Sequence, residues 1–147
     1  MPQSLINNNI HFVYSTRERQ RSISLQIQPK LWAYVAGIVK HIGGNPIAIG
    51  GMDDHIHILA EIPATVDIAK AVIAFKVNSS TWMKDHVRKF AWQRGYSAFS
   101  VSASSVPTVK KYVLSQAEHH KRRDFKAEYI ALLKKHGVQY DERFVFD

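Results

Sequence analysis

The order of strand-like and helix-like segments restricts the fold of this chain more than any other feature. Those segments follow as strand, helix, strand, strand, helix and strand, at residues 10–14, 31–42, 47–49, 55–62, 68–83 and 90–102. The two central strands flank a Gly-rich turn at 50–54, which predicts a β-hairpin. This order is typical of the ferredoxin-like split β-α-β pattern. We therefore predict an α+β fold with an antiparallel sheet and helices on one face.

The last third of the chain predicts further helices. Pro107 follows two serines and suits a first helical turn, so we expect a helix from there to about His120 that carries Tyr112. Asp124 can cap a second helix that ends at Gly137. The C-terminal tail is aromatic and is expected to pack on the body of the protein. A length of 147 residues fits one domain, covering 1–147.

Composition and charge narrow the function classes. Hydrophobic residues make up 46% of the chain, and 20 Lys and Arg against 12 Asp and Glu give a net charge of +8. A basic excess favours binding to a phosphate backbone. The absence of cysteine excludes disulfides, thiolate nucleophiles and Cys-based zinc sites. With neither a secretion signal nor a long apolar stretch in sight, we expect a cytoplasmic protein without a membrane partner.

His55 and His57 form the first motif with evident chemistry. Alternate residues of a strand point to one face, so both imidazoles project together while Ile56 and Ile58 face the helices. Two nitrogen donors on a rigid strand suit a divalent metal, although two surface histidines would give the same pattern. Leu59 stands where a third alternating histidine would be needed, which excludes nucleotide-binding proteins of that type.

Tyr112 and Gln116 are spaced to share one face of a helix, with His119 and His120 one turn later. A tyrosine with its ordinary pKa of about 10 needs a metal or a base to act as a nucleophile. Gln116 offers a neutral amide oxygen to a hard divalent ion. Ordinary packing of both side chains against the sheet would fit the same spacing.

Combined with the histidine pair, these residues make the chain resemble the single-tyrosine HUH transposases of the IS200/IS605 family. The resemblance covers nearly the whole chain and rests on an ordered set of segments. They are Ser15-Thr16 with its nearby arginines, Met52–Leu59, Lys76–Trp82, Gly95–Ser100, and Tyr112–Gln116 followed by His119-His120.

The resemblance implies that His55, His57 and Gln116 hold a divalent metal and that Tyr112 is the nucleophile. Such an enzyme cleaves and rejoins DNA through a 5′-phosphotyrosine, and mixed nitrogen and oxygen ligands suit Mg²⁺ or Mn²⁺. The implied partners are single-stranded DNA with hairpin ends and a second copy of the chain in a homodimer, in a prokaryotic cell.

Basic and aromatic side chains supply candidate DNA contacts. The basic candidates are Arg17, Arg19, Arg21, Lys76, Lys110, Lys111, Lys121, Arg122 and Arg123. The aromatic candidates for base stacking are Trp32, Trp82, Trp92 and Tyr96.

Three other functions remain open at this point. The first is a domesticated nuclease of the same family that processes repeated palindromes. The second is a non-catalytic ferredoxin-like module that binds nucleic acid by stacking on an exposed sheet face. The third is a metal-dependent hydrolase that uses activated water, in which Tyr112 would be dispensable.

Overall fold

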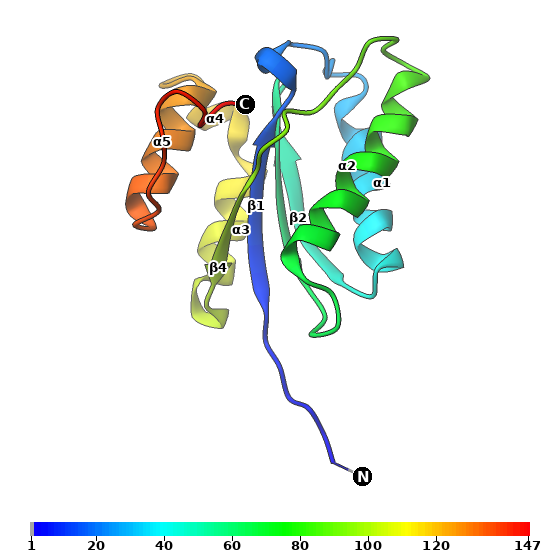
Figure 1. Ribbon diagram of the computed structural model, residues 1–147, viewed down its shortest axis with the longest axis vertical. Coiled ribbons are helices and arrows are strands. Elements are labelled where there is room, and N and C mark those ends of the chain that lie inside the picture. The colour runs from blue at the N-terminus through cyan, green and yellow to red at the C-terminus, as the bar shows by residue number, and fades with distance from the viewer. Residues whose placement is uncertain (1) are drawn as a thin grey trace.

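The computed structural model describes residues 2–147 and places a four-stranded antiparallel sheet between two groups of helices (Figure 1). The strands are β1 (Asn9–Ser15), β2 (Asn45–Gly51), β3 (His55–Glu61) and β4 (Ser97–Val101), in the spatial order β2-β3-β1-β4. β1 lies at the centre and pairs antiparallel with both β3 and β4. The predicted ferredoxin-like α+β fold is confirmed, with helices on both faces of the sheet rather than on one.

Two helices cover one face of the sheet, α1 (Gln28–His41) and α2 (Ile68–Lys84). α1 ends where Gly43 takes a φ of 89°, which favours glycine. α2 begins at Asp67, whose carboxylate accepts a hydrogen bond of 2.7 Å from the backbone N–H of Lys70. Alternation along β3 turns Ile56 and Ile58 into this core, as predicted.

The C-terminal helices cover the other face, on the side opposite α1 and α2 in Figure 1. They are α3 (Val106–Leu114), α4 (Gln116–His119) and α5 (Phe125–Lys135), and the short 3₁₀ helices η1 (Arg17–Arg19) and η2 (Ala103–Ser105) lie elsewhere in the chain. As predicted, the Asp124 carboxylate caps α5 with a bond of 3.0 Å to the N–H of Ala127, and Gly137 follows its end with a φ of 66°.

The expected continuous helix to His120 is broken at Ser115, which has non-helical φ and ψ of −112° and 34°. The Ser115 hydroxyl donates a hydrogen bond of 2.7 Å to the carbonyl of Lys111, and such bonds to the preceding turn bend helices. Periodicity alone carries no sign of this break. After it, Gln116 is buried at 2% exposure.

Gly50 on β2 allows α3 to approach the sheet closely. A Cβ atom on Gly50 would lie 2.3 Å from the carbonyl oxygen of Val113, so any side chain would push α3 away. Val113 itself packs on Ala48 and Leu59. This contact sets the distance between the sheet and the helix that carries Tyr112.

The remaining segments pack around this frame. Between Phe90 and Val101, only β4 is a strand; before it, Trp92 forms an isolated bridge with Thr16 and donates a hydrogen bond of 2.9 Å to the Ser79 hydroxyl. The aromatic tail packs against α5, as expected, with Phe146 near Tyr129. Among residues 2–147, none of the helices combines the length and apolar character of a membrane crossing.

Candidate active site

His55 and His57 of β3 are completely buried beneath the C-terminal helices. The sheet face that carries them is therefore covered, which leaves no exposed platform of aromatic side chains at this position. The two imidazole rings lie 5.2 Å apart between centroids. Strand alternation accounts for their common direction, and the packing of α3 and α5 accounts for their burial.

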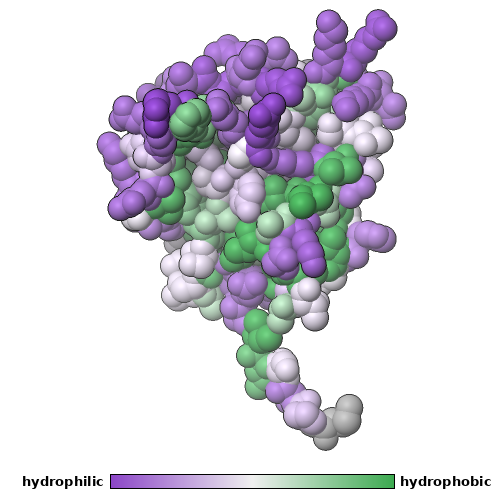
Figure 2. Space-filling model, viewed as in Figure 1, coloured by the Kyte–Doolittle hydropathy of each residue, from purple (hydrophilic) through white to green (hydrophobic). Residues whose placement is uncertain are grey.

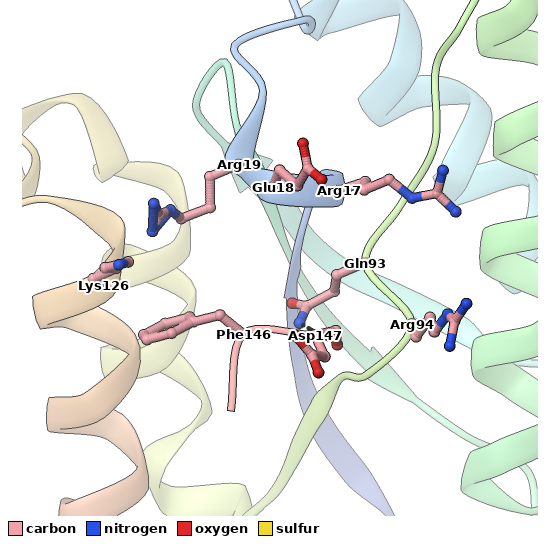
Figure 3. Close-up of a pocket in the computed structure, with 8 residues that line it drawn as sticks. All are labelled: Arg17, Glu18, Arg19, Gln93, Arg94, Lys126, Phe146 and Asp147. Atoms are coloured by element: carbon pink, nitrogen blue, oxygen red, sulfur yellow. Dashed lines mark hydrogen bonds between the residues drawn. The ribbon is translucent and has the colours of Figure 1, made fainter. Parts of the chain in front are cut away.

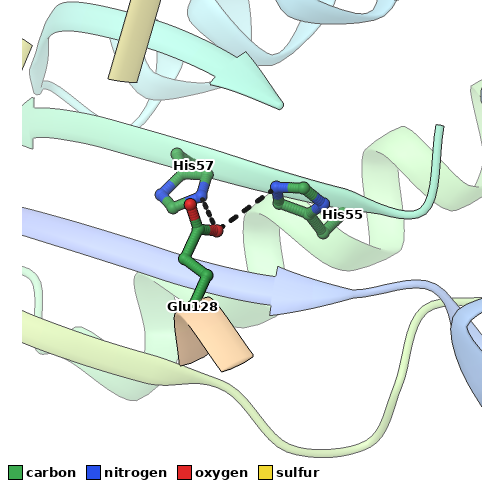
Figure 4. Close-up of side chains that lie close together, drawn as sticks. All are labelled: His55, His57 and Glu128. Carbon is green, nitrogen blue, oxygen red and sulfur yellow. Dashed lines mark hydrogen bonds and ion pairs between the residues drawn. The ribbon is translucent and has the colours of Figure 1, made fainter. Parts of the chain in front are cut away.

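Glu128 of α5 joins the histidine pair and was missed in the sequence (Figure 4). Its Oε1 lies 3.0 Å from Nε2 of His57 and 3.5 Å from Nε2 of His55. One coordinating atom from each of the three residues lies within 4.8 Å of the others. The sequence does carry one signal of this role. Glu128 stands at helical spacing from Phe125 and Leu132, which places an acidic side chain on the apolar side of the predicted helix.

The cluster is electrically polarised. Burial alone would raise the pKa of the Glu128 carboxyl, but hydrogen bonds with His120 and His57 and the charges of nearby imidazoles hold it well below its usual range. Burial lowers the pKa of His57, which the bond to Glu128 opposes only in part. Burial also lowers the pKa of His120, but the hydrogen bond to Glu128 and the negative charges of Glu128, Asp54 and Asp124 together raise it above its usual value. The core of the cluster is an ionised carboxylate beside a neutral imidazole.

Oxygen atoms surround Nε2 of His55. Its other ring nitrogen, Nδ1, lies 2.7 Å from the Asp54 carboxylate, which fixes the proton of a neutral ring on that side. In that neutral form, Nε2 would turn a lone pair toward Oε1 of Gln116 at 3.1 Å and Oε1 of Glu128 at 3.5 Å. Lone pairs that face one another need a proton or a metal cation between them. Gln116 thus lies where the resemblance places a ligand.

His11 of β1 hydrogen-bonds the ring nitrogen of His57 that faces away from Glu128. Its Nε2 shares a hydrogen bond of 2.8 Å with Nδ1 of His57, and the two rings stack with centroids 5.0 Å apart. Burial and the neighbouring His57 lower the pKa of His11. A partner on one nitrogen fixes which nitrogen of His57 faces Glu128. Sequence analysis gave no signal for this role, because His11 is a single residue within an apolar strand.

Tyr112 of α3 points its hydroxyl into the same cluster. The hydroxyl donates a hydrogen bond of 2.5 Å to Oε2 of Glu128, and the ring lies edge-on to His57 with centroids 5.7 Å apart. Burial, followed by the Glu128 charge, raises the pKa of Tyr112 well above its usual value. Without a further positive charge, the phenol therefore keeps its proton.

His119 and His120 follow Tyr112 by two turns in the sequence, and neither bonds the Tyr112 hydroxyl. The His119 ring packs on the Tyr112 ring at 4.6 Å, with its Nε2 3.3 Å from the Ser115 hydroxyl. His120 Nε2 lies 3.4 Å from Oε1 of Glu128. Glu128 is the group in hydrogen-bond contact with the phenol.

Arg17 and Arg19 border a hollow of about 730 Å³ at the end of β1, with Arg94 and Lys126 on its other walls. The two η1 arginines point to opposite sides of this hollow (Figure 3). Arg19 and the intervening Glu18 both have a φ of 54°, a strained conformation for residues with a Cβ atom. Hydrophilic side chains crowd this end of the molecule (Figure 2).

The other basic candidates differ in their surroundings. The exposed ones are Arg21, Lys110, Lys111, Lys121, Arg122 and Arg123. Lys76 is half-buried: its ammonium donates hydrogen bonds to the carbonyls of Gln93, Arg94 and Gly95 at 2.8, 3.1 and 2.7 Å. Burial lowers the pKa of Lys76 to about 8. Its position indicates a structural role.

The aromatic candidates are mainly packing residues. Trp92 is 7% exposed in the core, and Trp32 packs against the same core. Trp82 stacks on Tyr34 with centroids 5.3 Å apart. Tyr96 is 38% exposed and faces the Lys76 ammonium.

Comparisons with known proteins give a family and two similar folds. The family model for IS200-like transposases matches residues 4–116. Among solved structures, a candidate transposase of Deinococcus radiodurans R1 is similar with a TM-score of 0.63 at 18% identity, over 77% of this chain and 94% of that one. A REP-associated tyrosine transposase bound to a REP hairpin gives a TM-score of 0.56 at 14% identity, over 77% of this chain and 68% of that one. A search of curated proteins finds no significant match.

At these identities the structural likenesses establish the fold, whereas the family match is a match of sequence. It begins before β1 and ends at Gln116, so it includes both the histidine pair and Tyr112. Since it spans well over half of the chain, the protein belongs to the IS200-like transposase family.

Proposed function

We propose that this transposase cleaves and rejoins single-stranded DNA through Tyr112, with a divalent metal at the histidine pair. One observation carries the proposal: the Tyr112 hydroxyl and the nitrogens of His55 and His57 converge on the two oxygens of a single buried carboxylate, Glu128. A phenol, two imidazoles and a carboxylate in contact suit phosphoryl transfer to tyrosine.

The donor set fits a hard divalent cation. His55, His57, Gln116 and Glu128 would hold the ion, and Glu128 adds the anionic oxygen that the resemblance did not supply. At metal–ligand distances of about 2.1 Å, neighbouring octahedral ligands lie about 3.0 Å apart. Contacts of 3.0, 3.1 and 3.5 Å between these donor atoms are close to that spacing. Mg²⁺ or Mn²⁺, when bound, would polarise the scissile phosphate and stabilise the charge of the transition state.

The two Glu128 oxygens have separate tasks. Oε1 faces the imidazoles, and Oε2 accepts the hydrogen bond from Tyr112. In the proposed step, the phenol proton passes to Oε2 while the phenolic oxygen bonds to phosphorus. The bond from phosphorus to the 3′-oxygen breaks, and that oxygen takes up a proton. The reverse attack by another 3′-hydroxyl rejoins DNA without an external energy source.

The proposed substrate is single-stranded DNA with a hairpin end. The net charge of +8 supports it, as do the exposed basic residues and the likeness to a protein solved with a REP hairpin. One chain supplies every residue of this site, so the homodimer implied by the resemblance is not needed to assemble it. We place the activity in the prokaryotic cytoplasm.

A domesticated nuclease for repeated palindromes would use the same residues, and substrate choice separates the two functions. A transposase should prefer oligonucleotides that flank its own gene, whereas the nuclease should prefer repeated palindromes from the rest of the genome. The non-catalytic stacking module is disfavoured because α3–α5 cover the sheet face that it would use.

A covalent-adduct assay tests the proposal. Labelled oligonucleotides are incubated with protein and Mn²⁺ and run on a denaturing gel. A shifted band that disappears with EDTA and in Tyr112→Phe is expected. Cleavage that persists in Tyr112→Phe without any such band would instead establish a hydrolase.

A further inference from the structure

A second cavity adjoins the candidate active site. It measures about 540 Å³ and lies between β4, α3 and α5, with Tyr112 and His11 among its lining residues. Tyr112 thus faces two spaces: its hydroxyl bonds Glu128 in the metal cluster, and its side chain borders the cavity. His11 likewise lines the cavity while it hydrogen-bonds His57. Anything bound in this cavity therefore contacts the side chain of the proposed nucleophile.

The walls are of mixed chemistry. Val101, Val109 and Leu132 provide apolar surface, and the hydroxyls of Ser105 at the end of η2 and Thr108 on α3 provide polar groups. Ligand sites in proteins commonly have volumes of roughly 300–1,000 Å³ and combine apolar walls with a few polar groups. A sugar with an attached base has this same mixture of surfaces.

Positive charge and a stacked ring complete the lining. Arg123 and Lys135 are exposed at the cavity, and within residues 2–147 neither forms an ion pair. The His136 ring stacks on Phe99 with centroids 4.3 Å apart and also lines the cavity. Unpaired cations suit the phosphates on either side of a nucleoside, and a flat ring suits a base.

We infer that this cavity binds the deoxynucleoside adjoining the scissile phosphate. The inference rests on the proposed function and adds that the protein itself receives one base beside the cleavage point. Binding there would anchor the strand within one bond of the phosphate that Tyr112 attacks. Orientation of this kind contributes strongly to the rate of a phosphoryl transfer.

A substitution that fills the cavity tests the inference. Ala131 of α5 lines the cavity, so Ala131→Phe places a ring where the base would lie. Ala127 lies one turn earlier on the same helix, is exposed and does not line the cavity, so Ala127→Phe is the matched control. Thr108→Phe fills the cavity from α3 and serves if Ala131→Phe lowers the melting temperature.

The substrates are an unmodified oligonucleotide and two versions with an abasic site, one on the 5′ side and one on the 3′ side of the scissile phosphate. Ala131→Phe should slow adduct formation on unmodified DNA by about tenfold or more. It should recover to within about threefold of the wild type on one of the abasic oligonucleotides, because the missing base makes room for the ring. The oligonucleotide that rescues the variant identifies which nucleoside the cavity holds.

Two results would overturn the inference while leaving the proposed function intact. One is an unchanged rate for Ala131→Phe and Thr108→Phe on unmodified DNA. The other is a loss of rate that neither abasic oligonucleotide restores. A wild-type protein that forms no adduct with any oligonucleotide would overturn the proposed function, and this inference with it.

Discussion

Gly50→Ala should displace the helix that carries Tyr112. The new methyl carbon would lie 2.3 Å from the Val113 carbonyl oxygen, whereas Cβ atoms in proteins essentially never come within 3.0 Å of such an atom. α3 must therefore move outward by about 0.7 Å, the difference between these two distances. The neighbour is backbone in the last turn of α3, so no side-chain rotation can relieve the overlap.

Two magnitudes follow from this displacement. Overpacking of this kind costs about 1–3 kcal/mol in the free energy of unfolding. A shift approaching 1 Å at a reacting group can slow catalysis by up to about a hundredfold. We expect adduct formation by Gly50→Ala to fall by about 10- to 100-fold, with hairpin-DNA affinity nearly unchanged.

Chemical denaturation and the rate of adduct formation measure the two effects. The matched control is Gly37→Ala, in the interior of α1, where an added Cβ meets no atom within 4 Å. It should stabilise the protein by about 0.5–1 kcal/mol and leave the rate unchanged. If Gly50→Ala kept both the stability and the adduct rate of the wild type, the close packing of α3 on its own sheet would be refuted.

Three further predictions follow from the structure. Glu128→Gln keeps the shape of the side chain but removes its charge. The affinity for Mn²⁺, measured by calorimetry, should therefore fall by about 10-fold or more. An unchanged affinity would exclude Glu128 as a ligand. In metal-free protein, the lowered pKa values of His11 and His57 mean that the unfolded chain takes up protons first as pH falls below 6.5. The free energy of unfolding should therefore drop below that pH, by up to about 1.4 kcal/mol per pH unit for each proton. His120, with its raised pKa, has the opposite effect around pH 6.5, and at lower pH it is protonated in both states and contributes no slope. Stability that rises on acidification well below pH 6.5 would contradict this prediction, and His57→Gln should flatten the curve. Lys76→Met removes three hydrogen bonds to the segment before β4. It should lower the free energy of unfolding by about 2 kcal/mol and leave DNA affinity unchanged. Weaker DNA binding at full stability would instead support Lys76 as a phosphate contact.

Local patterns in the sequence were sufficient to predict the order and type of the main secondary-structure elements. Strand alternation placed His55 and His57 on one face and Ile56 and Ile58 on the other, because that parity depends only on the backbone. Helix caps such as Asp124 were also visible, since a cap bonds residues three positions away. These features need no knowledge of the tertiary arrangement.

The missed features depend on contacts between distant segments. Glu128 meets His57 across 71 positions of the chain, and no spacing rule connects two such residues. The break at Ser115 was hidden because no glycine or proline between Tyr112 and His120 marks it in the sequence. Charge alone could not distinguish Lys76, which is bound to three carbonyls, from the exposed Arg17 of η1.

Identification of the covalent bond tests the central claim most directly. Protein and a single-stranded oligonucleotide from the DNA flanking its gene are incubated with Mn²⁺, digested with nuclease and protease, and examined by tandem mass spectrometry. We predict that the peptide carrying Tyr112 gains a nucleotide joined through its 5′-phosphate, and that EDTA abolishes the modification. Cleaved DNA with an unmodified Tyr112 peptide, or a nucleotide found on any other residue, would contradict the assignment of Tyr112 as the nucleophile.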